Sequence, residues 1–173
     1  VEYAVKRGAA AVSVHVNLGN EFEPVMVKDL GETAECCEKW GMPLLAMMYV
    51  RDGFSGSEYD PAKIKHAARV AEELGADIIK VNYTGSLDSF AEVVDCVKIP
   101  VIIAGGPKMG SDRELLAMIR DATEAGGAGV AVGRNLFQHQ EPELLSKAVR
   151  CILNGGVKPE DIDELSAACS RVR

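Results

Sequence analysis

The 173-residue sequence predicts an α/β protein, the C-terminal part of a (β/α)8 TIM barrel with about five of its eight strands. Two observations predict this fold. Short apolar runs alternate with longer helical segments, which is typical of a parallel sheet with right-handed crossovers. Within the runs, apolar residues take one face and polar residues the other, as in strands that line a barrel. We expect a single domain over residues 1–173.

Five runs have the length and composition of strands. The first, residues 11–17, alternates three valines with polar residues, among them His15. The third, residues 77–83, places Lys80 on the face opposite its isoleucine and valine partners. The other three runs are residues 43–49, 101–106 and 129–134.

The helical segments between the runs carry end signals. Residues 24–40 are followed by Gly41, and Asp60-Pro61 caps a helix that ends at Gly75. Three further helices are expected, from Asp88, from Ser111 or Asp112 to Gly126, and from Pro142 to Leu153. A last short helix is expected from Pro159 to Ala168.

The sequence opens without methionine on residues 1–7, which look like the end of a helix closed by Gly8. Since a complete barrel needs eight strands, we expect three strands to precede those present. A doubly wound open sheet is the structural alternative, although its glycine-rich fingerprint is absent after the first run.

Composition and charge argue against several functions. The net charge of −7 argues against nucleic acid and anionic membranes as partners. No apolar run approaches the roughly 20 residues of a membrane span. The five cysteines form no CxxC pair, and their odd number indicates reduced thiols and a cytoplasmic location. No cluster of Cys, His and carboxylates has metal-ligand spacing, so neither a metal nor another cofactor is predicted.

Lys80 is the candidate nucleophile. A lysine amine in apolar surroundings loses its proton more easily and can then form a Schiff base with a ketone. An ion-paired or snorkelling lysine explains the pattern equally well. Tyr49 ends the preceding strand and suits either proton transfer or plain packing, and Arg51 suits either an anion or solvent. His15 is either a substrate contact or a structural histidine.

Two glycine turns, AGGPK and VGRN, follow the last two strands. Loops after the final strands of such barrels often hold phosphate, because glycine lets backbone N–H groups approach its oxygens. Gly105, Gly106 and Gly133 are the candidate glycines, and Lys108 and Arg134 are the candidate cations.

The runs AVSVHVNLG, GMPLLAMMY, ADIIKVNYTG, VIIAGGPK and GVAVGRNLFQH stand in an order that resembles the archaeal-type class I aldolases. The resemblance covers almost the whole chain. It implies that Lys80 forms the Schiff base and that Tyr49 is the proton donor. It also implies a site for a phosphorylated sugar, which maps onto Arg51, Gly105, Gly106, Gly133 and Arg134.

Within that family, MPLLAMMY and FQH look more like the heptulosonate synthases, which transfer a three-carbon unit to aspartate semialdehyde for aromatic amino-acid synthesis. Cleavage of fructose bisphosphate is the alternative inside the family. A non-catalytic barrel that binds sugar phosphates is the alternative of another class. The implied partners are a phosphorylated ketose, an aldehyde and further copies of the chain in a homo-oligomer.

The sequence departs from the family pattern in two respects. Val50 and Asp52 stand where the family has proline and glycine, which places the loop after Tyr49 in question. The first-strand aspartate that serves the family as a proton acceptor has no counterpart here. We therefore expect these residues alone to show negligible turnover, because a positioned acid–base group contributes about 10²–10⁴-fold.

Overall fold

The computed structural model describes residues 1–155 and 161–170 and contains one parallel sheet. Its order is β1-β2-β3-β4-β5, and every pairing is between strands that are consecutive in the sequence. β1 and β5 form the two edges and do not pair with each other, as the strand count predicted. The strands are β1 Val12–Leu18, β2 Leu44–Val50, β3 Ile78–Val81, β4 Val101–Ala104 and β5 Gly129–Ala131.

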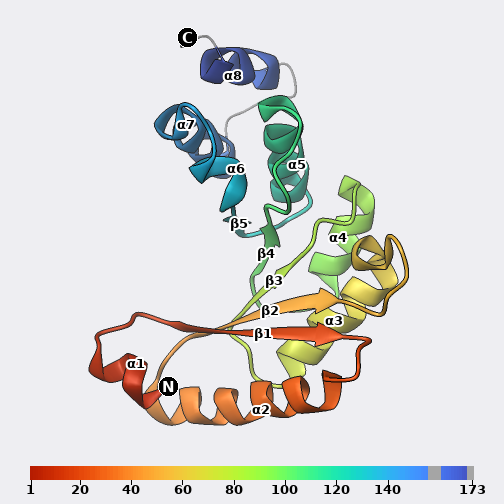
Figure 1. Cartoon of the computed structure of the whole chain (residues 1–173), viewed down its shortest axis with the longest axis vertical. Helices are drawn as coiled ribbons and strands as arrows, with labels where there is room; N and C mark the ends of the chain where they lie inside the picture. Colours follow the sequence, from red (N-terminus) through yellow and green to blue (C-terminus); the bar gives the residue numbers. More distant parts are fainter. Residues whose placement is uncertain (156–160, 171–173) are drawn as a thin grey trace.

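The unreversed strand order excludes the alternative of a doubly wound sheet, in which the order reverses at a switch point. It is the order of a barrel segment, which confirms the predicted fold class. Figure 1 shows α2 at one end of the molecule and α8 at the other, with the sheet twisting between them.

Helices fill the intervals between the strands. They are α1 Glu2–Lys6, α2 Glu23–Trp40, α3 Pro61–Glu73, α4 Leu87–Asp95, α5 Asp112–Glu124, α6 Arg134–Phe137, α7 Pro142–Leu153 and α8 Asp161–Ser170. The 3₁₀ turn η1 Ser57–Tyr59 and the short α6 were not predicted, because neither is long enough to show a helical period. The expected start of α8 at Pro159 lies outside the described residues.

The end signals read from the sequence are confirmed with one correction. The side chain of Asp60 caps α3 by accepting from the N–H groups of Ala62 and Lys63. α4 begins at Leu87 and not at Asp88, because the Ser86 hydroxyl accepts from a backbone N–H in the first turn and acts as its N-cap.

Alternate residues of the strands are buried against the helices. Val16, Ile79 and Val81 are fully buried, whereas His15 on the opposite face of β1 is exposed. The helices complete this layer with large apolar side chains, of which Phe90, Leu116 and Leu145 are fully buried. The polar residues therefore lie on the face of the sheet that the helices leave uncovered, and the candidate site is on this face. No helix of the described residues is apolar over a length that could cross a membrane.

Candidate active site at the carboxyl ends of the strands

Strand register places Lys80 at the centre of the polar face. It lies opposite Met47 of β2 and Ile102 of β4, on the middle strand of the sheet. Tyr49 is two residues beyond Met47, so its side chain points to the same face as that of Lys80. Lys80 itself is half-buried. Lys80 therefore lies on a face that opens to a pocket, so its position in the strand is explained without a buried ion pair.

A pocket of about 450 Å³ opens on this face and brings the predicted residues together. The eight predicted residues that line it are His15, Tyr49, Arg51, Lys80, Gly105, Gly106, Gly133 and Arg134. Lys108 is not among the lining residues; its amine donates instead to the carbonyl of Gln138 at 3.1 Å. The shared location is a structural fact, and the roles assigned to the eight residues stay predictions.

Aromatic and polar contacts hold the Tyr49 ring in place. The ring centroids of His15 and Tyr49 are 4.9 Å apart, and the Arg51 guanidinium lies 5.4 Å from the Tyr49 centroid. The Nε2 atom of His15 donates a hydrogen bond at 2.8 Å to the side-chain oxygen of Asn17. His15 and Arg51 therefore contact the tyrosine from neighbouring positions of the pocket wall.

Asp52, which replaces a glycine of the family pattern, has a structural role in the loop after Tyr49. The Asp52 carboxylate accepts hydrogen bonds from the Lys63 amine and the Ser57 hydroxyl, each at 2.6 Å, and from the backbone N–H of Phe54. The side chain of Asp52 is absent from the lining of the pocket. Its charge is therefore neutralised by α3 and organises the loop, with no contact to the proposed phosphate region.

The two glycine turns approach each other closely. A Cβ atom added at Gly105 would lie 3.0 Å from the Cα atom of Val132, which is closer than an ordinary van der Waals contact, so any other residue here would push the backbone after β5 away. The N–H of Gly105 already donates to Ala131 at 3.0 Å. That N–H therefore serves the sheet, and the role of Gly105 in phosphate binding stays a prediction that rests on its place in the pocket wall. Gly106, at φ 63°, takes the chain away in a left-handed conformation.

Asn135 joins the turns and was not identified from the sequence. Its amide nitrogen donates to the carbonyls of Gly105 and Pro107, each at 2.9 Å. Its side-chain oxygen accepts from the N–H of Met109 at 2.7 Å. A buried amide with three partners is a rigid connection, since losing any of them leaves a buried polar group unpaired. Asn135 thus fixes the relative position of the two turns.

Three further polar residues in the wall were also missed as site residues. Asn82 could have been found, because it lies two residues after Lys80 on the polar face of its strand. Glu58 and Tyr59 come from η1, in a loop where the sequence shows no periodicity. Among the described residues no group of three or more His, Cys, Asp or Glu is arranged to hold a metal ion.

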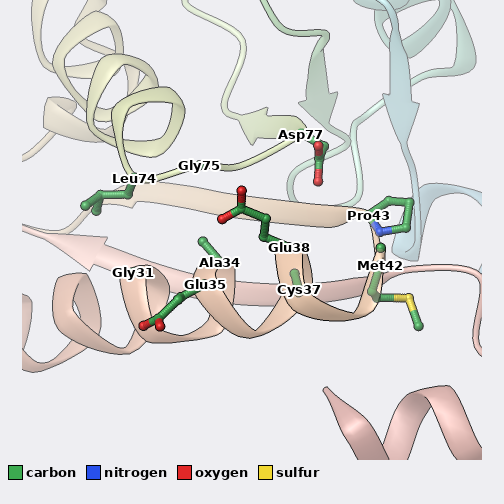
Figure 2. Close-up of a pocket in the computed structure, with 11 residues that line it drawn as sticks. Gly31, Ala34, Glu35, Cys37, Glu38, Met42, Pro43, Leu74, Gly75 and Asp77 are labelled. Carbon is green, nitrogen blue, oxygen red and sulfur yellow. The ribbon is translucent and has the colours of Figure 1, made fainter.

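A second, larger hollow of about 750 Å³ lies at the other end of the strands (Figure 2). Residues of α2 form one side of it, and Asp77 at the start of β3 lies across from them. Its charged lining residues are Glu35, Glu38 and Asp77, with no Lys, Arg or His. An acidic hollow is unsuited to phosphate, and sites of such barrels lie at the carboxyl ends of strands.

The fold is that of a barrel segment, and its pocket at the carboxyl ends of the strands contains Lys80. Comparison with known proteins gives the family. Residues 1–139 match the family described as DeoC/LacD family aldolase. The chain belongs to the DeoC/LacD family of aldolases.

Relatives and a solved structure refine this comparison. The chain is 48% identical over 160 residues to a 2-amino-3,7-dideoxy-D-threo-hept-6-ulosonate synthase of Halobacterium salinarum, covering 92% of this chain and 60% of that protein. It is 43% identical to a 2-amino-4,5-dihydroxy-6-oxo-7-(phosphonooxy)heptanoate synthase of Streptomyces griseus, and the match covers 91% of this chain and 58% of that protein. This chain therefore spans about 60% of the length of the curated relatives that it matches.

A solved archaeal fructose-1,6-bisphosphate aldolase superposes with a TM-score of 0.85 at 35% identity, covering 90% of this chain and 62% of that one. That structure has its catalytic lysine covalently bound to the carbinolamine intermediate of the substrate.

The Asp52 network predicts a transition at low pH. Hydrogen bonds from Lys63 and Ser57 lower the pKa of Asp52 from 3.8 to about 2. A carboxylate with a depressed pKa stabilises the folded loop fully above its unfolded pKa, and this contribution is lost as the pH falls through the folded value. We expect the loop of residues 51–57 to loosen between about pH 4 and pH 2. Carboxyl NMR titration measures the pKa directly.

The control for this titration is Asp52→Asn, which removes the ionisable group. In that variant the conformation of the loop should not change between about pH 4 and pH 2, since residue 52 has no proton to gain. A measured pKa for Asp52 at or above its ordinary value would contradict the network.

The close approach of the turns predicts a steric effect at Gly105. Gly105→Ala should destabilise the protein by about 1–3 kcal/mol, because the added methyl forces the backbone of Val132 to move. It should also reduce the stabilisation that inorganic phosphate gives in urea unfolding. Gly110→Ala is the matched control, since its added Cβ would meet only the Glu114 carboxylate at 3.5 Å. Equal effects of the two substitutions would show that the contact is unimportant.

Proposed function

We propose that the protein is a Schiff-base aldolase or transaldolase of the 2-amino-3,7-dideoxy-D-threo-hept-6-ulosonate synthase type, acting in aromatic amino-acid biosynthesis. The observation that carries this proposal is the gathering of Lys80, Tyr49 and the two glycine turns in one pocket. Identity supports the synthase type, since it is 48% to the Halobacterium synthase and 35% to the fructose-bisphosphate aldolase. We also propose that residues 1–173 correspond to one domain, the C-terminal part of an aldolase barrel.

The names of the two synthase relatives describe seven-carbon acids with an amino group at carbon 2 and a ketone at carbon 6. An aldol addition joins the carbon beside the ketone to the carbonyl carbon of the acceptor. A ketone at carbon 6 therefore corresponds to a new bond between carbons 4 and 5. For this protein we propose a three-carbon unit from a phosphorylated ketose as donor and aspartate semialdehyde as acceptor.

The proposed chemistry starts at the Lys80 amine. In its neutral form it adds to the ketone carbon, and loss of water gives an iminium. The iminium accepts the electron pair of the breaking carbon–carbon bond, while a base takes the proton of the departing aldehyde's hydroxyl. The resulting enamine adds to the acceptor aldehyde, whose oxygen gains a proton. Water then hydrolyses the new iminium and releases the product and the free amine.

Tyr49 is the proposed proton carrier for these steps. It shares the pocket and the sheet face with Lys80, and His15 and Arg51 contact its ring. A phenol held in this way can give a proton to a forming alkoxide and take it back. His15 is proposed to contact the substrate beside it.

The phosphate is proposed to bind between the turns that follow β4 and β5. Arg134 lines the pocket there and supplies charge, and Asn135 holds the turns together. Among the described residues the N–H groups of Gly106 and Gly133 have no hydrogen-bond acceptor, so they remain available to phosphate oxygens.

Cleavage of fructose bisphosphate is the second candidate function. The solved aldolase favours it through its TM-score of 0.85, and the same lysine chemistry would serve both reactions. A barrel that binds sugar phosphates without turnover would use the turns and leave Lys80 unreacted.

We further propose a cytoplasmic location, which the free thiols of Cys36, Cys37, Cys96 and Cys151 support. A homo-oligomer is proposed as the working assembly. Exposed apolar side chains on α2, among them Val25 and Trp40, support a surface of that kind.

The test of the proposed function is Lys80→Met in the natural protein. The substitution keeps an apolar chain of similar length, so the fold should persist while condensation of a ketose phosphate with aspartate semialdehyde is abolished. Lys65→Met is the control, because Lys65 pairs with Glu92 on the outer helices at 2.6 Å. Product formation by Lys80→Met within tenfold of the natural protein would refute the role of Lys80.

A further inference from the structure

One charged residue of the pocket has no part in the mechanism described above. Glu58 is the single carboxylate among the described residues that line the pocket, whereas Arg51, Lys80 and Arg134 contribute cationic groups. A carboxylate repels phosphate and carboxylate groups, so its presence works against the binding of the anionic parts of the substrates. Its position therefore favours a cationic neighbour, which is either Arg51 or a cationic group of a substrate.

The backbone at Glu58 is firmly held. Its carbonyl accepts a hydrogen bond at 3.1 Å from the side chain of Asn82, two residues after Lys80. On the other side, the Ser57 hydroxyl donates to Asp52 at 2.6 Å. η1 is thus tied both to the end of β3 and to the loop after β2, which keeps Glu58 in the wall of the pocket.

The contact of Glu58 with Arg51 is loose. The Nη1 atom of Arg51 and the Oε2 atom of Glu58 are 3.9 Å apart, and the two side chains are 46% and 36% exposed. An ion pair with this exposure contributes little to stability. Both groups keep most of their hydrogen-bonding capacity, since a guanidinium has five N–H donors and a carboxylate about four acceptor positions.

We propose that Arg51 and Glu58 form a clamp for the α-amino acid group of the acceptor aldehyde. This inference rests on the proposed function. Arg51, which the resemblance assigned to the phosphorylated sugar, is assigned here to the α-carboxylate of the acceptor, and Glu58 binds the α-ammonium. These two groups are only two bonds apart on one carbon. A pair of opposite charges 3.9 Å apart matches that arrangement. Glu58 is thereby the residue that selects an amino-acid aldehyde over one without the amine.

The strand order gives this clamp a suitable place relative to the phosphate turns. Arg51 follows β2, Lys80 is on β3, and the turns follow β4 and β5. Strands lie about 4.8 Å apart, so the clamp and the turns are separated by roughly 10–15 Å with Lys80 between them. A phosphate at one end and an amino acid at the other leave the reacting carbons at the lysine.

The experiment compares two four-carbon aldehyde acids in the natural protein. L-aspartate semialdehyde carries the α-amine, and succinate semialdehyde lacks it. Glu58→Gln should lower kcat/KM for L-aspartate semialdehyde by about 10- to 100-fold, the range expected for loss of a hydrogen bond to a charged group. It should leave kcat/KM for succinate semialdehyde nearly unchanged. Arg51→Met should lower both, because both acceptors carry a carboxylate.

Glu92→Gln is the matched control, since Glu92 pairs with Lys65 away from the pocket and should affect neither acceptor. An equal loss for both aldehydes in Glu58→Gln would overturn the inference and show that Glu58 acts only through Arg51 or the loop. An unchanged ratio of the two kcat/KM values would overturn it as well. Absence of condensation with either aldehyde in the natural protein would refute the proposed function itself, and the clamp with it.

Discussion

Parallel pairing of neighbouring strands is the constraint on which the site depends. Because every strand pairs in parallel with the next one in the sequence, the carboxyl ends of all five strands lie at the same end of the sheet. The side-chain period of two then sends Lys80 and Tyr49 to the same face, although they are far apart in the chain. A slip of one residue in the pairing of β2 with β3 would place one of them among the buried residues.

The pocket differs in charge from the molecule that contains it. The protein carries a net charge of −7, yet the pocket is lined by three cationic side chains and one carboxylate. The larger hollow at the amino ends of the strands has the opposite character, with three carboxylates. The local charge at each end of the sheet, and not the net charge of the protein, thus decides which end suits an anionic substrate.

The sequence was sufficient for the five strands, the longer helices and most of the pocket residues that lie on or directly after strands, although Asn82 was not identified as one of them. Alternation along β1 and β3 marked the polar face, and the glycine turns marked the ends of β4 and β5. It was not sufficient for Glu58 and Tyr59, because their 3₁₀ turn is too short for any period to appear. Asn135 was missed for another reason: its partners, Gly105, Pro107 and Met109, lie in a different turn that only the tertiary structure brings near. The use of the Gly105 N–H by Ala131 could not be predicted either, because it depends on pairing register, which local sequence does not reveal.

The central claim is that the amine of Lys80 reacts with a ketone. Its most direct test is borohydride reduction of the natural protein in the presence of a ketose phosphate, followed by peptide mapping with mass spectrometry. The account predicts one stable adduct, on the peptide that contains Lys80. Lys63 and Lys108, which donate to Asp52 and Gln138, should remain unmodified. An adduct on one of these lysines, or none at all, would contradict the account.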